Sequence, residues 1–221
     1  MSSADPIVYV VDDDLAVRQA LGSLIRSIGL RVEMFASARE FLEHPQSDAP
    51  SCLLLDVQLP DFSGLDLSEQ LNASEFQIPI IFITGHGTIP MSVRAIKGGA
   101  VEFLTKPFQE DDLIRAIQQA LAHDQAAREK RAELGELRHR FERLTARERD
   151  VLALVVRGLL NKQIAGELGT AEQTVKTQRS QMMRKLEVTS VAELVHLVEH
   201  VAGQPWAPPI HRADLAPNSP G

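Results

Sequence analysis

The strongest constraint on the fold is an alternation, in the first half of the chain, between short apolar runs and amphipathic stretches. Each run has the length and composition of a buried strand, and each is followed by apolar residues at helical spacing. Repeated strand–helix units predict an α/β domain, a doubly wound parallel sheet. The predicted strands are residues 7–11, 31–35, 52–56, 78–84 and 100–104.

Three carboxylates follow the strands that should lie side by side in this sheet. In a flavodoxin-like five-stranded sheet of order 2-1-3-4-5, ligands bind between the carboxyl ends of strands 1 and 3. The first strand is followed by Asp12 and Asp13, and the third ends at Asp56. A carboxylate in an apolar setting is costly unless a cation or hydrogen-bond donors stabilise it. Hard oxygen ligands suit Mg²⁺, and we expect this cofactor here.

Two further polar residues complete a candidate phosphorylation site. Thr84 ends the fourth predicted strand and Lys106 follows the fifth. A carboxylate such as Asp56 can attack phosphorus to form an aspartyl phosphate, while a hydroxyl and an ammonium group neutralise the phosphoryl oxygens. Taken singly, each motif has a plainer explanation: residues 12–14 could cap the next helix, and Lys106 could be a surface lysine.

Four motifs together, "VVDDD", "LLLDVQLPDFSGLDL", "ITGHG" and "EFLTKPF", resemble the receiver domain of two-component response regulators across about residues 5–121. The resemblance implies that a histidine kinase phosphorylates Asp56. It also implies that Asp13, Asp56 and the backbone carbonyl of Gln58 ligate Mg²⁺, with Asp12 acting through water. Thr84 and Lys106 would hold the phosphoryl oxygens.

The resemblance also implies a conformational switch formed by Thr84 and Phe103, and a cis peptide between Lys106 and Pro107. His86 resembles a metal ligand by type, but a single histidine in "GHGT" is better explained as a loop residue near the site, where it would influence dephosphorylation.

The charges divide unevenly along the chain. Residues 1–121 carry 8 Lys/Arg against 17 Asp/Glu, net −9, whereas residues 144–200 carry 8 against 7, net +1. Bulk charge therefore does not favour nucleic acid, and any DNA contact requires a local basic face in the second half. We divide the chain into a receiver (1–121), a linker (122–143), a second helical domain (144–200) and a Pro-rich tail (201–221).

Nothing in the sequence indicates a membrane segment or a signal peptide. No apolar stretch approaches the ~20 residues of a transmembrane helix, and the first residues lack a basic region followed by a long apolar one. The single cysteine, Cys52, has no partner for an internal disulfide. We therefore expect a cytoplasmic protein with no membrane partner.

The linker allows two structures. Apolar residues recur at heptad spacing, which favours one helix continuing from about residue 110 to about residue 143. Gly135 instead favours a break, with a solvated, charged linker carrying one apolar stripe. Both alternatives remain open from the sequence. The stripe consists of Leu134, Leu137, Phe141 and Leu144.

The second half predicts four short helices with marked starts and stops. A hydroxyl residue is followed three positions later by Glu or Gln in three places, which is the spacing of a capping box. The pairs are Thr145 with Glu148, Thr170 with Gln173, and Ser190 with Glu193. Gly158 and Gly169 are typical helix stops.

One predicted helix has two distinct faces. If it runs from Thr170 to Leu186, apolar side chains gather on one side, and small, polar and basic residues without an acid gather on the other. Such a helix suits a DNA major groove, with a preceding helix at about 161–168 crossing the backbone. The alternative is a four-helix packing domain whose polar face is only solvated. The candidate DNA contacts are Lys162, Thr174, Lys176, Thr177, Arg179, Ser180, Arg184 and Lys185; Lys162, Arg179 and Lys185 suit phosphates.

The motifs "LTARERDVL", "NKQIAGELG", "TVKTQ" and "RKLEVTSVAELV" resemble the LuxR-type helix-turn-helix domain of the FixJ/NarL class of response regulators. There are departures: Gln178 replaces a frequent His, Met182 a usual Ile, and Leu160 a common Ser or Thr. The resemblance implies that the helix at about 191–200 mediates dimerisation.

We therefore expect a phosphorylation-controlled transcription factor that dimerises when phosphorylated, and not an enzyme. Its expected partners are a cognate sensor histidine kinase, promoter DNA, a second copy of the chain and RNA polymerase. A haloacid-dehalogenase-like phosphatase would need an acid where Gln58 stands, and a flavodoxin-like electron carrier would need a phosphate-binding loop after the first strand.

Overall fold

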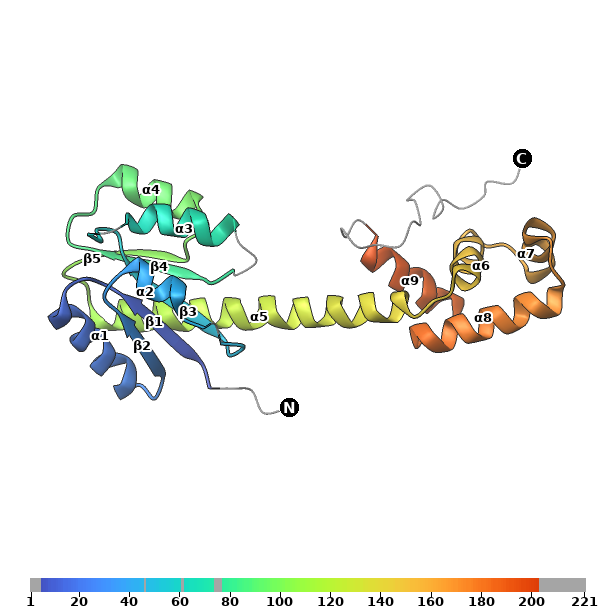
Figure 1. Ribbon diagram of the computed structural model, residues 1–221, viewed down its shortest axis with the longest axis horizontal. Helices are drawn as coiled ribbons and strands as arrows, with labels where there is room; N and C mark the ends of the chain where they lie inside the picture. The colour runs from blue at the N-terminus through green and yellow to red at the C-terminus, as the bar shows by residue number, and fades with distance from the viewer. Residues whose placement is uncertain (1–4, 46, 61, 74–76, 203–221) are drawn as a thin grey trace. The chain divides into compact units, whose positions relative to one another are not determined.

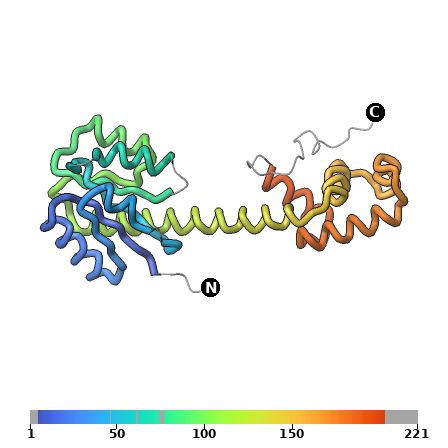
Figure 2. The backbone as a smooth tube through the Cα atoms, viewed as in Figure 1, coloured from blue at the N-terminus to red at the C-terminus, as the bar shows by residue number. Residues whose placement is uncertain are grey.

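The computed structural model describes residues 5–45, 47–60, 62–73 and 77–202. The predicted tail lies outside the described residues, apart from 201 and 202. The chain forms two compact units, residues 1–129 and residues 130–221 (Figures 1 and 2). Within the described ranges, every helix is too short or too polar to cross a lipid bilayer.

The first unit is built on a five-stranded parallel sheet of order β2-β1-β3-β4-β5, which confirms the predicted fold and strand order. The strands are β1 (Ile7–Val11), β2 (Arg31–Phe35), β3 (Ser51–Asp56), β4 (Ile80–Thr84) and β5 (Glu102–Thr105). β5 begins two residues later than predicted, because Gly99 adopts a left-handed turn and Ala100 donates its N–H to Ala95 at the end of the preceding helix.

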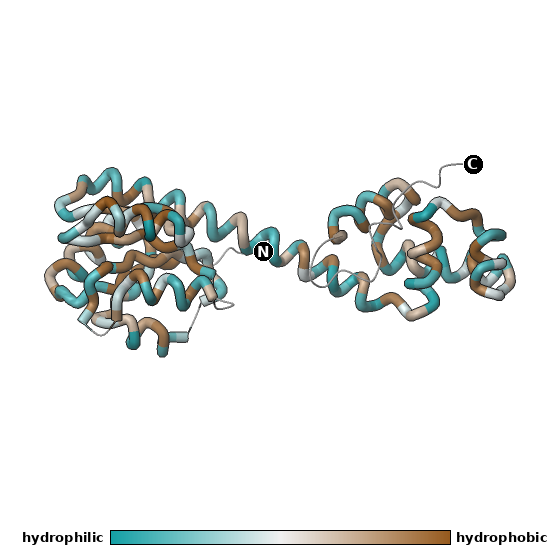
Figure 3. The backbone as a smooth tube through the Cα atoms, turned by 90° about the horizontal axis from the view of Figure 1, so that it is seen from above, coloured by the Kyte–Doolittle hydropathy of each residue, from teal (hydrophilic) through white to brown (hydrophobic). Residues whose placement is uncertain are grey.

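Helices cover both faces of the sheet (Figure 1). α1 (Leu15–Ser27) and the first part of α5 (Glu110–Glu142) pack on one face; α2 (Ala38–Glu43), α3 (Gly64–Ala73) and α4 (Ile89–Lys97) pack on the other. Side chains of β1 alternate between the two apolar cores, as a strand requires: Tyr9 and Val11 enter one core, and Val8 and Val10 enter the other. Apolar residues accordingly concentrate on the strands in Figure 3.

The second unit is helical. It contains the end of α5 together with α6 (Ala146–Val156), α7 (Asn161–Leu168), α8 (Glu172–Leu186) and α9 (Val191–Val201). α5 continues through Gly135, so of the two linker structures the continuous helix is the correct one. The apolar stripe of α5 packs into the core of this unit, where Leu137 and Phe141 are buried with Leu144.

The predicted helix caps have three different outcomes. Thr145 and Glu148 form the expected capping box at the start of α6. At α9, Ser190 accepts the N–H of Glu193 as predicted, but the Glu193 carboxylate bonds to Thr189 instead of Ser190.

The predicted cap at Thr170 is wrong. α8 begins after Ala171, which has no capping side chain. Thr170 instead donates its backbone N–H to Ala165 at 3.0 Å, and this bond closes the end of α7 around Gly169. Gly169 has φ +61°, and Gly158 after α6 has φ +84°, so both predicted stops use the left-handed conformation that favours glycine. The short turn between α7 and α8 thus leaves Thr170 in the closing turn of the first helix.

Candidate functional site

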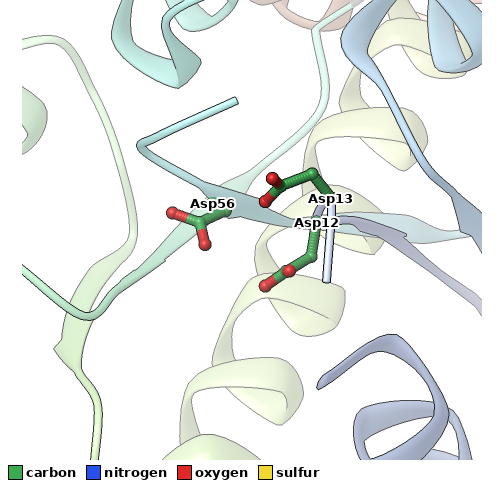
Figure 4. A group of neighbouring side chains, drawn as sticks. All are labelled: Asp12, Asp13 and Asp56. Atoms are coloured by element: carbon green, nitrogen blue, oxygen red, sulfur yellow. The ribbon is translucent and has the colours of Figure 1, made fainter. Parts of the chain in front are cut away.

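Three carboxylates meet at the carboxyl ends of β1 and β3, as predicted. Asp12 and Asp13 extend from the end of β1 and Asp56 from the end of β3 (Figure 4). One oxygen of each carboxylate lies within 4.8 Å of the others. Asp12 and Asp56 are buried, with 2% and 8% of their surface exposed, and Asp13 is exposed. The carboxylates line an open hollow of about 570 Å³ that Gln58 and His86 also border.

Lys106 joins this group from the loop after β5. Its ammonium Nζ lies 2.7 Å from Asp12 Oδ2 and 3.0 Å from Asp56 Oδ2. The Lys106 N–H donates to the Thr84 carbonyl, and the Lys106–Pro107 peptide is cis, as the resemblance implied. The structure therefore gives Lys106 a position inside the site, and the surface-lysine explanation is wrong.

The pKa shifts follow from burial and from these contacts. Burial raises the pKa of Asp12 above its usual value, although the Lys106 ammonium and the Asp14 N–H oppose the shift. Burial lowers the pKa of Lys106, but its hydrogen bonds to Asp12 and Asp56 outweigh burial and leave this pKa raised. Three carboxylates against one ammonium leave surplus negative charge. An oxygen-rich, anionic donor set of this kind fits Mg²⁺.

Thr84 and Phe103 lie on neighbouring strands. Thr84 is fully buried at the end of β4, and its Oγ1 accepts the backbone N–H of His86 at 3.2 Å. Phe103 is half-buried on β5, with its ring centre 6.2 Å from that of Phe82. His86 is an exposed loop residue beside the hollow, as predicted.

Sequence reasoning missed several residues that shape this site. A Cβ at Gly64 would come within 2.3 Å of the Asp56 carbonyl oxygen, so only glycine fits beside the backbone that follows β3. A Cβ at Gly87 would lie 2.6 Å from Thr105 Cγ2. Gly64 in "FSG" and Gly87 in "GHG" can be recognised in the sequence as turn residues. The groups that they approach are known only from the fold.

The helix-cap explanation of the acidic run holds for one residue. Asp14 is the N-cap of α1, where its carboxylate accepts the N–H groups of Ala16 and Val17 at 2.7 and 3.3 Å. Asp12 instead accepts the Asp14 N–H and faces Lys106. Of these nearby acids, Asp14 caps a helix and Asp12 faces the acidic cluster.

In the second unit, α8 has the two predicted faces. Val175, Met182 and Leu186 are fully buried. Six of the eight candidate DNA contacts are exposed: Lys162, Thr174, Lys176, Thr177, Ser180 and Arg184. A shallow hollow of about 460 Å³ lies along α8 and the turn that follows it, and is bordered by Lys176, Arg179 and Arg184. The expectation that this face carries no acid is wrong, because Glu172 pairs with Lys176 at 3.3 Å.

The other two candidates have partners inside the unit. Arg179 is partly buried and donates from Nη1 to Asn161 Oδ1 at 2.9 Å, which links α8 to the start of α7. Lys185 Nζ lies 2.6 Å from Oε2 of Glu148, whose side chain is only 3% exposed. Burial raises the pKa of Glu148, but hydrogen bonds from Lys185 and Thr145 outweigh it, so the net pKa is lowered. This pairing argues against a phosphate contact by Lys185.

The apolar stripe of α9 packs into the core of the second unit. Leu194 and Val198 are buried in the core with Val201, and Val191 and Val195 are half-buried against it. Leu160 is the N-cap of α7 and is 69% exposed. It occupies the position where LuxR-type domains often have Ser or Thr. Its backbone N–H donates to Gln163 Oε1 at 2.8 Å, so this helix start is satisfied without a capping hydroxyl.

Comparison with known proteins finds a matching family model for each of the two units. A family model described as "Response regulator receiver domain" matches residues 8–118, and one described as "Bacterial regulatory proteins, luxR family" matches residues 142–198. The chain is 50% identical over 201 residues to response regulator protein TodT of Pseudomonas putida, covering 91% of this chain and 88% of TodT. It is 39% identical over 193 residues to the transcriptional regulatory protein FixJ of Rhizobium meliloti, covering 87% and 95% of the two chains.

Among solved structures, the response regulator StyR matches with a TM-score of 0.84 and 53% identity, covering 89% of this chain and 100% of StyR. A receiver sheet with an acidic site, joined to a helix-turn-helix unit, defines a DNA-binding response regulator. The chain belongs to the two-component response regulators of the FixJ/NarL class, in which a receiver domain is combined with a LuxR-type DNA-binding domain.

Proposed function

We propose that a cognate sensor histidine kinase phosphorylates Asp56 and that this modification controls dimerisation and promoter binding. The observation that carries the proposal is the Lys106 ammonium, which contacts both Asp12 and Asp56 across the strand ends. An ammonium held there is ready to contact the oxygens of a phosphoryl group on Asp56.

Asp13, Asp56 and the backbone carbonyl of Gln58 would ligate Mg²⁺, with Asp12 acting through water. When bound, the ion supplies positive charge that supports the ionised Asp56 nucleophile and the phosphoryl oxygens. Lys106 adds a second positive charge from the loop after β5, at the same edge of the sheet. Thr84 Oγ1 already accepts the His86 N–H, so its own proton remains available to donate to a phosphoryl oxygen.

The phosphoacceptor role has a direct test. Asp56→Asn should abolish phosphorylation by a small acyl-phosphate donor with Mg²⁺, because an amide is not a carboxylate nucleophile. Intact-mass measurement detects the added phosphoryl group. An added phosphoryl group on the Asp56→Asn protein would assign the acceptor to another residue.

Dimerisation on phosphorylation is proposed to use the face formed by α4 and β5. A phosphoryl group draws Thr84 towards it and leaves space for Phe103 to rotate inward, which changes this face. α4 exposes three apolar side chains, Ile89 at 81%, Val93 at 45% and Ile96 at 48%. Such side chains suit a partner surface.

Sedimentation with beryllium fluoride and Mg²⁺ should show a mass increase that Ile96→Glu prevents. Arg94→Glu is a less direct probe, because Arg94 is already paired with Glu69 at 2.7 Å and Asp66 at 3.3 Å. An unchanged mass in the wild-type protein would refute phosphorylation-driven dimerisation, and an Ile96→Glu protein that still associates would place the dimer face elsewhere.

The second unit is proposed to read promoter DNA through α8, with half-sites about one DNA turn apart in the dimer. Lys176→Ala should weaken specific binding preferentially, by about 1–3 kcal/mol, if the ammonium contacts base edges. Lys162→Ala should weaken cognate and random DNA alike, because a phosphate contact carries no sequence information. Equal losses on both DNAs for Lys176→Ala would remove its base-reading role. RNA polymerase is the proposed partner at the promoter.

A further inference from the structure

The linker helix carries a buried acid beyond the end of the receiver motif. Asp124 lies on α5, after residue 118, where the match to the receiver model ends. Its side chain is only 1% exposed. Carboxylates are seldom fully buried unless they are paired and hydrogen-bonded. The burial of Asp124 therefore depends on the partners of its carboxylate.

The contacts of Asp124 tie the helix to the sheet. Asp124 Oδ2 accepts the backbone N–H of Ser51 at 2.8 Å and the Nε–H of Arg128 at 2.6 Å. Arg128 also donates from Nη1 to the backbone carbonyl of Asp48 at 3.1 Å. We name Asp124 and Arg128, with the Ser51 and Asp48 backbone groups that they bind, the linker clamp. All of these residues belong to the first unit.

The strand held by the clamp is the one that carries the phosphoacceptor. Ser51 is the first residue of β3 and Asp56 is the last. β3 is fully buried and pairs with β1 and β4 on either side. One short, rigid strand therefore has the modification site at one end and the linker anchor at the other.

We propose that Asp124 and Arg128 are positioning residues that couple the linker helix to β3, so that phosphorylation of Asp56 changes DNA affinity only when the clamp is intact. The inference rests on the proposed control of DNA binding by Asp56. Because α5 continues without a break to Glu142, a change in how its first part is held by the sheet is passed along one helix instead of being lost in a flexible loop.

The chain offers a matched control one position along the same helix. Gln125 and Glu129 form a hydrogen bond of 2.6 Å with the same i,i+4 spacing, but on an exposed part of the helix surface. Asp124→Asn and Arg128→Met break the clamp, and Gln125→Ala breaks only the exposed pair. Asp124→Asn keeps an oxygen for the Ser51 N–H, which limits the loss of stability.

Cys52 supplies a local readout. It is the only cysteine of the chain, it follows Ser51 on β3, and it is fully buried. Burial, and after it the Asp124 carboxylate, raise the pKa of this thiol. Labelling by a thiol reagent in the full-length protein therefore reports local opening, and rates at several pH values separate opening from a changed thiol pKa.

Asp124→Asn and Arg128→Met should raise the Cys52 labelling rate at least about tenfold, since each removes a charged hydrogen bond. Gln125→Ala should label at the wild-type rate. If Asp124→Asn also labels at the wild-type rate, the clamp does not hold β3 and the proposal fails.

The functional readout is the ratio of DNA affinities with and without beryllium fluoride and Mg²⁺, on a duplex selected from random DNA by the wild-type protein. We expect Asp124→Asn to accept phosphate from an acyl-phosphate donor to the wild-type extent, while its affinity ratio falls towards 1. Gln125→Ala should keep the wild-type ratio. A wild-type ratio of 1 would refute phosphorylation control itself. An Asp124→Asn ratio equal to a wild-type ratio well above 1 would overturn the clamp alone.

Discussion

The two units each contain a lysine in contact with a buried carboxylate, and the two contacts differ in their charge balance. Lys106 faces Asp12 and Asp56, with Asp13 nearby, in a hollow open to solvent. Among the described residues Lys185 faces one carboxylate, that of Glu148, which also accepts the Thr145 N–H. The first contact leaves negative charge for a cation, whereas the second is neutral. The two contacts therefore differ mainly in charge: the cluster around Lys106 has surplus negative charge, and the Lys185–Glu148 pair has none.

Breaking the neutral pair should produce the largest loss of stability. Glu148→Ala leaves Lys185 uncompensated and removes one half of a capping box, so we expect a loss of about 3–5 kcal/mol in the free energy of unfolding of the second unit. Native-state hydrogen exchange on the full-length protein measures the two units separately. Glu172→Ala, which breaks an exposed pair with Lys176, should cost below about 1 kcal/mol. Equal effects of the two substitutions would contradict the structural role of Glu148.

The open site should respond to a metal, and the neutral pair should not. Mg²⁺ at about 100 times its dissociation constant should stabilise the first unit by about 2.7 kcal/mol, because binding favours the folded state. Asp13→Asn should remove most of this gain, and in metal-free buffer it should unfold no more easily than wild type, since it reduces repulsion among the carboxylates. Calorimetry in EDTA and in MgCl₂ gives both quantities. Full Mg²⁺ stabilisation of Asp13→Asn would place the ion elsewhere.

Acidification should affect the two units in opposite directions. The lowered pKa of Glu148 gives the second unit stability that is present above the unfolded pKa and is lost as pH falls through the folded one. The raised pKa of Asp12 has the reverse sign, so protonation of Asp12 relieves the metal-free first unit as pH falls from neutral. Hydrogen exchange over a pH series checks both slopes, with Glu148→Gln and Asp12→Asn as controls. Parallel slopes in the two units would contradict this assignment.

The smallest expected effect concerns two adjacent cations of α8. Arg184 is exposed beside the hollow, whereas Lys185 is paired with Glu148. Arg184→Met should reduce the slope of log K against log salt by about 0.9 in DNA binding, which corresponds to one phosphate contact. Lys185→Met should lower stability and leave the slope unchanged. A reduced slope for Lys185→Met would restore it as a DNA contact.

The sheet and the acidic cluster at its edge were predictable because both depend on patterns that are local in the sequence. Each strand is an apolar run, and parallel strands bring the residues at their carboxyl ends to one edge. Asp12, Asp56 and Lys106 could therefore be assembled without coordinates. Thr84 was found in the same way, as the last residue of its strand.

The sequence did not reveal a competing local hydrogen bond at Thr170 or the tertiary contacts of Lys185 and Asp124. Thr170 had the spacing of a helix cap, but its backbone was needed to close α7. Lys185 had the residue type and helix position of a phosphate contact, but it forms an ion pair with Glu148, 37 positions earlier in the chain. Asp124 had no distinguishing neighbours in sequence, and one of its hydrogen-bond partners, Ser51, is 73 positions away.

We propose that phosphorylation of Asp56 controls the DNA affinity of the second unit. The most direct test is a titration of the full-length protein with its selected DNA duplex, at one fixed salt concentration, with and without beryllium fluoride and Mg²⁺. We expect the phosphate mimic to raise the DNA affinity of the wild-type protein and to leave that of Asp56→Asn unchanged. An affinity that does not respond to the mimic in the wild-type protein, or that responds equally in Asp56→Asn, would contradict it.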